Sequence, residues 1–276
     1  MLENITGIQN APDFKTFMIM GTPGGGKTTI AGTFPKPLLV IDIKNASGAQ
    51  VLKNKYKQGD VDFVSISSKP GSSVYQQLRD TLKELTTKEY KYKSVLIDPI
   101  TSVPEDLEQA AMAAKRGVAL NFDEYKSINK MILDLREDIQ RASLKYNMIL
   151  NAHIKYKEDS DRIDGEITNK IIPKTTYNNG NNLIETCQVV IYTTKKTVIS
   201  ADGKTKNIKF VSFIGSHPNI PGLKVQMGTN LVEIGSWVEN LTYDKLISII
   251  NGGKINATSV VEQKTGNPFD TDGKEE

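Results

Sequence analysis

Short apolar segments alternate with longer amphipathic segments along most of the chain. The short segments are rich in aliphatic and β-branched side chains and are bounded by Gly, Pro, Lys or Asn, which is typical of buried strands. The segments that we expect to form strands are residues 17–20, 37–42, 61–66, 94–98, 148–152 and 188–193.

The segments between these strands have the spacing of helices. In residues 72–85 and 122–146, apolar side chains recur three or four positions apart and mark one buried stripe. Residues 27–33 follow a glycine loop, and residues 104–116 open with Pro104 and two acids, which suits the first turn of a helix. This alternation predicts an α/β fold with a mostly parallel sheet flanked by helices.

The pattern changes in the second half of the chain. Residues 155–182 show hardly any apolar periodicity and are far longer than a usual connection, so we expect a long functional or mobile loop. A C-terminal β-hairpin extension should follow, with strands at residues 197–200 and 208–214. We therefore expect one domain over residues 1–253 and a disordered tail over residues 254–276.

The composition excludes several classes of protein. With 276 residues, 24% of them charged and 38% apolar, the chain is neither a disordered tail protein nor a disulfide-stapled miniprotein. A formal charge of +3 is mild for a dedicated duplex-DNA-binding protein. Cys187 is the only cysteine, which excludes a disulfide framework and a thiolate zinc cluster. Since there is no secretory leader and no run of 18 apolar residues, we expect a soluble cytoplasmic protein with no membrane partner.

One motif carries a specific chemistry. Residues 21–28 read Gly-Thr-Pro-Gly-Gly-Gly-Lys-Thr and match the pattern G-x-x-x-x-G-K-[ST] between an expected strand and an expected helix. The glycines allow backbone N–H groups to surround a phosphate at a helix N-terminus. Lys27 would bring a positive charge to the β- and γ-phosphates, and the Thr28 hydroxyl would bind Mg²⁺. The expected nucleotide-binding residues are Gly21, Thr22, Pro23, Gly24, Gly25, Gly26, Lys27, Thr28 and Thr29.

A phosphate loop needs an acid from another strand to hold the magnesium ion. The apolar strand 94–98 ends in Asp98, which has the required form. Taken alone, Asp98 would more readily be an acid that caps a strand. Paired with the phosphate loop, Thr28 and Asp98 become the expected metal ligands, with ATP and Mg²⁺ as the expected cofactors.

Together these features resemble the RecA-like P-loop ATPases. The resemblance rests on the phosphate loop, on the apolar strand that ends in Asp42, on the strand that ends in Asp98, and on the strand that ends in His153. Within this group, the short chain is most similar to the phage-encoded recombination ATPases of the single-strand-annealing type, which implies a place in the host cytoplasm. The resemblance covers about residues 14–240.

The resemblance also implies roles for individual residues. Lys27 and Thr28 would hold the phosphates and the metal, and Asp98 would be the acid on the magnesium side. His153 stands where RecA-like proteins have a polar residue that senses the γ-phosphate, and a neutral imidazole can both donate and accept a hydrogen bond. The alternative is that His153 only caps a strand.

One position departs from the family pattern. RecA-like enzymes have a water-orienting glutamate two residues beyond the acid that ends the second strand, and Lys44 stands there. A lysine cannot accept a proton from water at neutral pH unless its pKa is greatly lowered. Either Asp42 reaches the water, which makes it a candidate catalytic residue beside Lys27 and His153, or hydrolysis is slow.

Residues 155–182 lie where the RecA-like family has its mobile DNA-contacting loop, so the resemblance implies that role for them. The charges of this segment cancel, but its second half contains Lys170, Lys174 and Tyr177 and no acid. Cations that follow the backbone and a ring that stacks on bases are what single-stranded DNA requires. These three residues are the expected DNA-binding residues, and the alternative is a flexible surface loop.

Three functions are compatible with the sequence. The leading one is a Mg²⁺-dependent ATPase that binds single-stranded DNA and promotes annealing or homologous recombination, as a homo-oligomer and with a single-strand-binding protein as a further partner. The second is a nucleotide-gated binding module that hydrolyses ATP slowly and acts through a protein partner. The third is an ATP motor of another P-loop branch.

Overall fold

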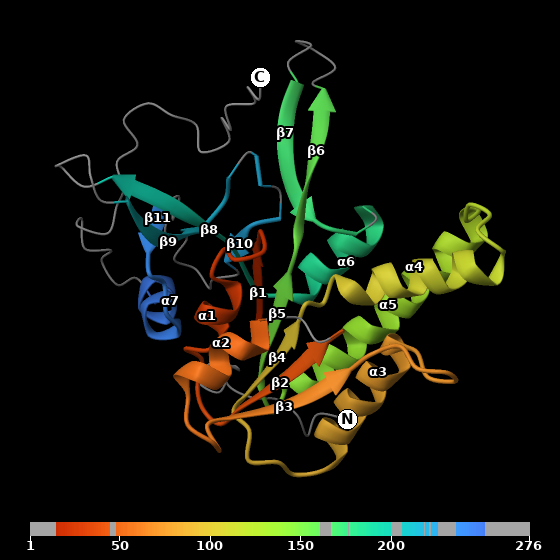
Figure 1. Cartoon of the computed structure of the whole chain (residues 1–276), viewed down its shortest axis with the longest axis horizontal. Coiled ribbons are helices and arrows are strands. Elements are labelled where there is room, and N and C mark those ends of the chain that lie inside the picture. The colour runs from red at the N-terminus through yellow and green to blue at the C-terminus, as the bar shows by residue number, and fades with distance from the viewer. Residues whose placement is uncertain are drawn as a thin grey trace, which may run out of the picture.

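The centre of the protein is a sheet of nine strands within the described residues (Figure 1). The computed structural model describes residues 15–44, 48–160, 167–175, 177–199, 206–217, 219–220, 222–225 and 236–251. The strands lie in the order β11–β9–β8–β1–β5–β4–β2–β3, and β10 pairs with β8. Their bounds are β1 Thr16–Gly21, β2 Leu38–Ile43, β3 Val61–Ile66, β4 Ser94–Asp98, β5 Asn147–Ala152, β8 Val189–Ile199, β9 Lys206–Ile214, β10 Lys224–Val225 and β11 Ser236–Glu239.

The strands from β3 to β8 in this order all run parallel to their neighbours. Strands β9 and β11 then continue the sheet in antiparallel fashion. Parallel strands must be joined by crossovers that cover the sheet, which explains why the central strands are continuously apolar. The mostly parallel α/β fold predicted from the sequence is confirmed.

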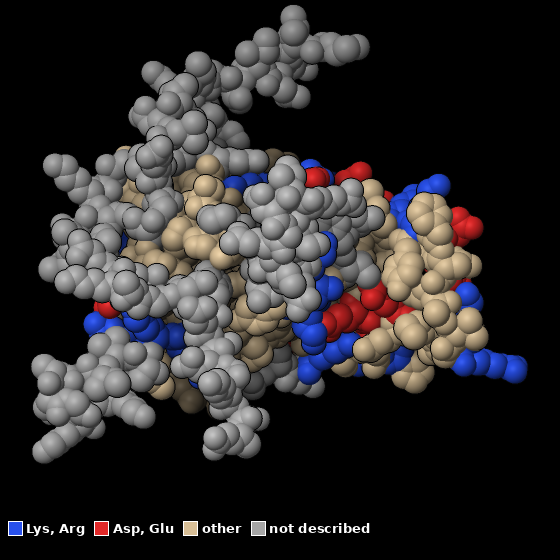
Figure 2. Space-filling model, turned by 90° about the horizontal axis from the view of Figure 1, so that it is seen from above, with Lys and Arg blue, Asp and Glu red and all other residues tan. Residues whose placement is uncertain are grey.

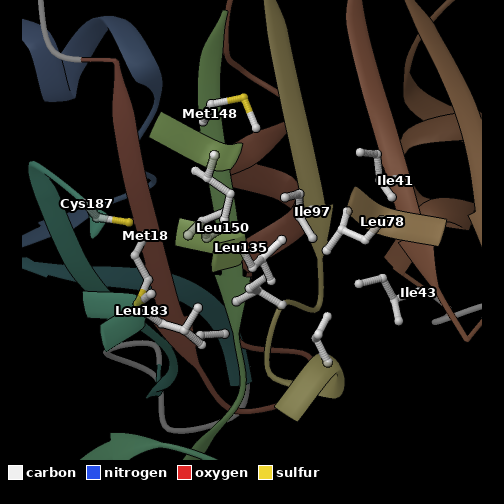
Figure 3. Packing of buried hydrophobic residues seen from close by; sticks show 14 of the residues in the cluster. Met18, Ile41, Ile43, Leu78, Ile97, Leu135, Met148, Leu150, Leu183 and Cys187 are labelled. Carbon is white, nitrogen blue, oxygen red and sulfur yellow. The ribbon is translucent and has the colours of Figure 1, made fainter. Parts of the chain in front are cut away.

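Helices cover both faces of the sheet. One face carries α3 (Val74–Thr87), α4 (Ser102–Ala114), α5 (Phe122–Ser143) and α6 (Tyr177–Thr186), and the other carries α1 (Lys27–Ala31), α2 (Gly48–Lys55) and α7 (Tyr243–Ile250). Figure 3 shows Leu78 and Leu135 pointing from α3 and α5 toward Ile97 and Leu150 of the strands, and all four are fully buried. Each such side chain stabilises the fold by about 1.5–3 kcal/mol.

The functional edge of the sheet follows from the strand order. Strand β5 lies between β1 and β4, and all three are parallel. Their carboxyl ends therefore meet at one edge, where Gly21, Asp98 and the residue after β5, His153, come together although they are far apart in sequence.

The described part of the segment expected to be a long loop is mostly regular structure. Residues 155–182 contribute to β6 (Ile154–Ser160) and β7 (Ile167–Pro173), which form an antiparallel hairpin, and to the start of α6. The hairpin projects from the carboxyl edge of the sheet (Figure 1). The prediction was wrong because the strands are paired although, among the side chains that the structure describes in the hairpin, the buried ones lie at its root, such as Ile171 and Ile172. Apolar periodicity therefore fades although the backbone is fully paired.

Other boundaries also differ from the predicted ones. The segments expected at 188–193 and 197–200 form one strand, β8, and its hairpin with β9 extends the main sheet. Helix α2 was not predicted. The tail expected at 254–276 lies outside the described residues. Within the described part of the chain, no helix is long and apolar enough to span a membrane.

Candidate functional site

The loop between β1 and α1 is shaped by its glycines. Strand β1 ends at Gly21, and α1 begins at Lys27. Gly24 and Gly26 have φ angles of 72° and 95°, in the left-handed region that side chains disfavour. At Gly26 a side chain would also be excluded sterically, because a Cβ there would lie 2.8 Å from the ring of Phe210.

Strands β8 and β9 support this loop. The Thr193 hydroxyl donates to the carbonyl oxygen of Gly25 (3.0 Å), and the Ser212 hydroxyl donates to Thr193 Oγ1 (3.1 Å). A Cβ on Gly21 would lie 2.3 Å from the Thr193 carbonyl oxygen, so only glycine permits this close approach. The conformation of the loop therefore depends on residues about 170 positions away in the sequence.

Lys27 lies inside the loop and is only 6% exposed. Its Nζ donates to the carbonyl oxygens of Gly21 and Thr22, both at 2.9 Å, and lies 3.4 Å from His153 Nδ1. Burial lowers the pKa of Lys27 to about 8, and the Asp98 carboxylate opposes this shift. The ammonium group is therefore charged at pH 7 but becomes neutral under mildly alkaline conditions.

This lowered pKa gives nucleotide binding a defined pH dependence. Nucleotide affinity should be nearly constant below pH 8 and should fall above it, because deprotonation of Lys27 removes the charge that faces the phosphates. Bound phosphates favour the charged ammonium, so the pKa of the free protein marks where the decline begins. Titration with a fluorescent ATP analogue at constant free Mg²⁺ measures this profile. An affinity that stays flat to pH 10 would contradict the assignment.

Thr28, Asp98 and Asn151 form a compact group of oxygens beside Lys27. The Thr28 hydroxyl donates to Asp98 Oδ2 at 2.7 Å, and Asn151 Nδ2 donates to Thr28 Oγ1 at 3.4 Å. Asp98 and Asn151 are both buried. Asn151 Oδ1 is buried and has no hydrogen-bond partner in the described structure.

This group of oxygens fits a hard divalent cation. Mg²⁺ prefers carboxylate, hydroxyl, water and phosphate oxygens, and it usually takes only one or two protein ligands beside a nucleotide. Thr28 and Asp98 are the residues that would hold it. Among the described residues, no cluster of three or more His, Cys, Asp or Glu could bind a metal without the nucleotide.

His153 connects this group to the projecting hairpin. Burial, followed by the charge of Lys27, lowers the pKa of His153 from its usual value, so the imidazole is neutral at pH 7. Its backbone N–H donates to the Thr101 hydroxyl (3.3 Å) at the start of α4. Its carbonyl oxygen accepts from the backbone N–H of Lys174 (2.8 Å), directly after β7.

Lys44 points away from this site. Its Nζ lies 3.3 Å from Asp106 Oδ1 on α4, and the Ser68 hydroxyl donates to the same oxygen at 2.7 Å. Asp42 lies beside Asp98 in the register of β2 and β4. Neither Lys44 nor Asp42 is among the described residues that line the cleft, so a catalytic role for Asp42 stays a prediction.

The three residues expected to bind DNA do not lie on one loop. Lys170 lies on β7 opposite Lys157 of β6. Lys174 follows β7, and its Nζ lies 3.4 Å from Glu105 Oε1. Tyr177 is the first residue of α6.

The phosphate loop, Asp98 and His153 line a single cleft of about 410 Å³, a size that suits a small ligand. Two further side chains belong to it, Val51 of α2 and Phe210 of β9. The lining residues are Pro23, Gly24, Gly26, Lys27, Thr28, Thr29, Val51, Asp98, His153 and Phe210. The structure thus brings most of the sequence-predicted site together.

Comparison with known families agrees with this geometry. A model of the AAA domain family matches residues 13–220, which is most of the chain. The chain belongs to this family. AAA domains are P-loop ATPases that generally use ATP and Mg²⁺, so the broad nucleotide-binding part of the RecA-like resemblance is supported. No curated protein matches the chain.

Sequence analysis missed several residues around the cleft of this AAA domain. Asn151 carried a usable signal, because it is a polar residue inside the apolar strand β5. Thr193 and Phe210 could not be recognised from the sequence, since their positions depend on how β8 and β9 pair with the rest of the sheet.

Proposed function

We propose that this AAA domain is a Mg²⁺-dependent ATPase that binds single-stranded DNA through the β6–β7 hairpin and promotes strand annealing or homologous recombination as a homo-oligomer. In this proposal Lys27 and the backbone of the phosphate loop bind the triphosphate, and Thr28 and Asp98 hold the metal. Asp42 positions water, and a single-strand-binding protein is a further partner.

The observation that carries the DNA part is the way the hairpin is attached to the phosphate site. Strand β6 begins one residue after His153, and the residue after β7 hydrogen-bonds to the His153 carbonyl oxygen. His153 in turn lies 3.4 Å from Lys27 Nζ. A change at the phosphates can therefore reach both strands of the hairpin through one residue, His153.

The hairpin has a face suited to a polyanion. Residues directly opposite in an antiparallel pair share a face, so Lys157 and Lys170 lie on the same side, together with Lys155 and one acid, Asp159. Lys155 and Lys157 are exposed. Cations along one face of a strand pair are what the phosphate backbone of a single strand requires.

A second function, a nucleotide-gated module that acts through a protein partner, is favoured by the mixed charge of the described surface. On the described part of the face in Figure 2, Lys and Arg lie beside a group of Asp and Glu. Lys44–Asp106 and Lys174–Glu105 are ion pairs in which residues of α4 hold lysines from other parts of the chain. A uniformly cationic surface would have favoured a nucleic acid more strongly.

ATP hydrolysis with and without single-stranded DNA tests the proposal. Stimulation by DNA supports the ATPase that binds DNA, and a slow rate that DNA does not change supports the protein-binding module. The triple variant Lys155→Gln, Lys157→Gln and Lys170→Gln should weaken DNA binding. It should also reduce the slope of log affinity against log salt concentration by about 2, since each lost phosphate contact removes about 0.7.

The matched control replaces three lysines on another surface, with the variant Lys53→Gln, Lys55→Gln and Lys57→Gln. It removes the same charge and should leave the salt slope nearly unchanged, apart from a weak long-range effect. If both triple variants lose the same affinity, net charge and not the hairpin governs binding, and the assignment of the hairpin is wrong.

A further inference from the structure

Strand β9 places an aromatic ring over the phosphate loop. Phe210 lines the cleft, and its ring packs against Gly26 so closely that a Cβ there would lie 2.8 Å away. It is the only aromatic side chain among the described residues that line the cleft. The sequence pattern assigned no role to it.

The position of Phe210 is fixed by its strand. Side chains alternate along β9, so Phe210 lies on the same face as Ser212, whose hydroxyl reaches the loop through Thr193. On the other side of the strand, the backbone N–H of Asn240 donates to the Phe210 carbonyl oxygen at 2.9 Å. The same strand therefore holds both the loop and the ring.

The apolar surface continues beyond the ring. Ile208 is two residues from Phe210 on the same face of β9, and it is 62% exposed. Ile208 and Phe210 together form an apolar surface next to the polar phosphate loop. A nucleotide has the same division, with a charged phosphate chain joined to a flat base.

We propose that Phe210 binds the base of the nucleotide by stacking, and that the site accepts adenine and guanine nucleotides with similar affinity. This inference rests on the proposed nucleotide-binding function and identifies the substrate class of that site. Aromatic rings stack on any base because every base has a π-face, and each such contact strengthens binding by roughly 5- to 100-fold.

The lack of base discrimination follows from the other lining side chains. In the described part of the cleft, the polar ones are Lys27, Thr28, Thr29, Asp98 and His153. Lys27, Thr28, Asp98 and His153 contact one another at the phosphate end. No described lining residue is an Asn, Gln, Glu or Arg that could pair with the edge of a base, and the Thr29 hydroxyl can both donate and accept, so it suits either purine.

Binding of ATP, GTP and inorganic tripolyphosphate, each with Mg²⁺, tests this inference by calorimetry. The wild-type protein should bind ATP and GTP within about threefold of each other. Phe210→Leu keeps an apolar side chain on Gly26 but removes the flat ring, so ATP and GTP should each bind roughly 10-fold more weakly. Tripolyphosphate has no base, and its affinity should change less than twofold, which is within the effect of a neutral substitution. Phe210→Tyr should restore nucleotide binding.

Phe213→Leu is the matched control, because Phe213 lies on the same strand but packs into the opposite face against Trp237. It should leave the ratio of ATP to tripolyphosphate affinity unchanged. If Phe210→Leu weakened the affinities for ATP and for tripolyphosphate equally, Phe210 would only support the conformation of the phosphate loop. That result would overturn the inference. A 100-fold preference for ATP over GTP would also overturn it. If wild-type protein bound none of the three ligands, the proposed nucleotide-binding function itself would fail.

Discussion

Replacing Lys27 with alanine is expected to reduce the affinity for Mg²⁺-ATP by about 100-fold. Removing one partner of a buried, hydrogen-bonded charge pair costs about 2–5 kcal/mol, and about 2.7 kcal/mol corresponds to a factor of 100. Lys27 is 6% exposed and lies at the start of α1, inside the loop that would receive the phosphates. Calorimetric titration of wild-type and variant protein measures the difference directly.

The control for this experiment is Lys36, a second lysine whose pKa is lowered by burial. Burial also lowers the pKa of Lys36 to about 8, but its Nζ donates to the Gly32 carbonyl oxygen and lies over the ring of Tyr56. Lys36→Ala should therefore keep ATP binding. Because burial disfavours the charged form of Lys27, the Lys27→Ala protein should unfold near the wild-type temperature without nucleotide. A folded Lys27→Ala protein that binds ATP normally would disprove the phosphate-site assignment.

Replacing Asp98 with asparagine is expected to lower the rate of ATP hydrolysis by about 100- to 1,000-fold, since loss of one charge-stabilising group at a reacting phosphate has an effect of this size. Asparagine retains an oxygen that can accept from the Thr28 hydroxyl, so the local fold should survive. The negative charge that attracts Mg²⁺ is lost. Hydrolysis measured over a range of Mg²⁺ concentrations should show a strongly raised requirement for the metal.

Asp62→Asn provides the comparison for this variant. Asp62 lies on β3, and its partners are Lys91 Nζ at 2.9 Å and the Tyr92 hydroxyl at 3.1 Å. It is an acid on the same sheet but outside the cleft, so hydrolysis and its Mg²⁺ dependence should not change. An Asp98→Asn protein with normal metal dependence would mean that another group holds the cation.

The central strands and their helices could be predicted from the sequence because their burial is complete. Residues 94–98 form β4 with the predicted limits, because all five are buried and the apolar run ends at Asp98. Residues 61–66 also form β3 as predicted, although this edge strand is only partly buried. Helix α5 begins at the predicted Phe122, because Asn121 and Glu124 form a capping box before it. Such signals are local and can be recognised without a tertiary structure.

The β6–β7 hairpin could not be predicted for the opposite reason. Its strands carry charged residues on exposed faces, and their backbone hydrogen bonds pair residues within the hairpin and not with the apolar core. Lys44 illustrates a related limit. The sequence places it in the position of a catalytic glutamate, but its side chain pairs with Asp106, which lies on a helix two strands further along the chain.

The sequence by itself determined that this chain folds as a mostly parallel α/β domain with a phosphate loop, because the glycines, the lysine and the threonine of residues 21–28 act through their own conformational and chemical properties. Tertiary structure alone decided which other residues share that site. Asn151, Thr193 and Phe210 reach it through strand order and register, and these depend on pairing between segments more than 100 residues apart. Composition and periodicity record how deeply a residue is buried, but not which distant residue lies beside it.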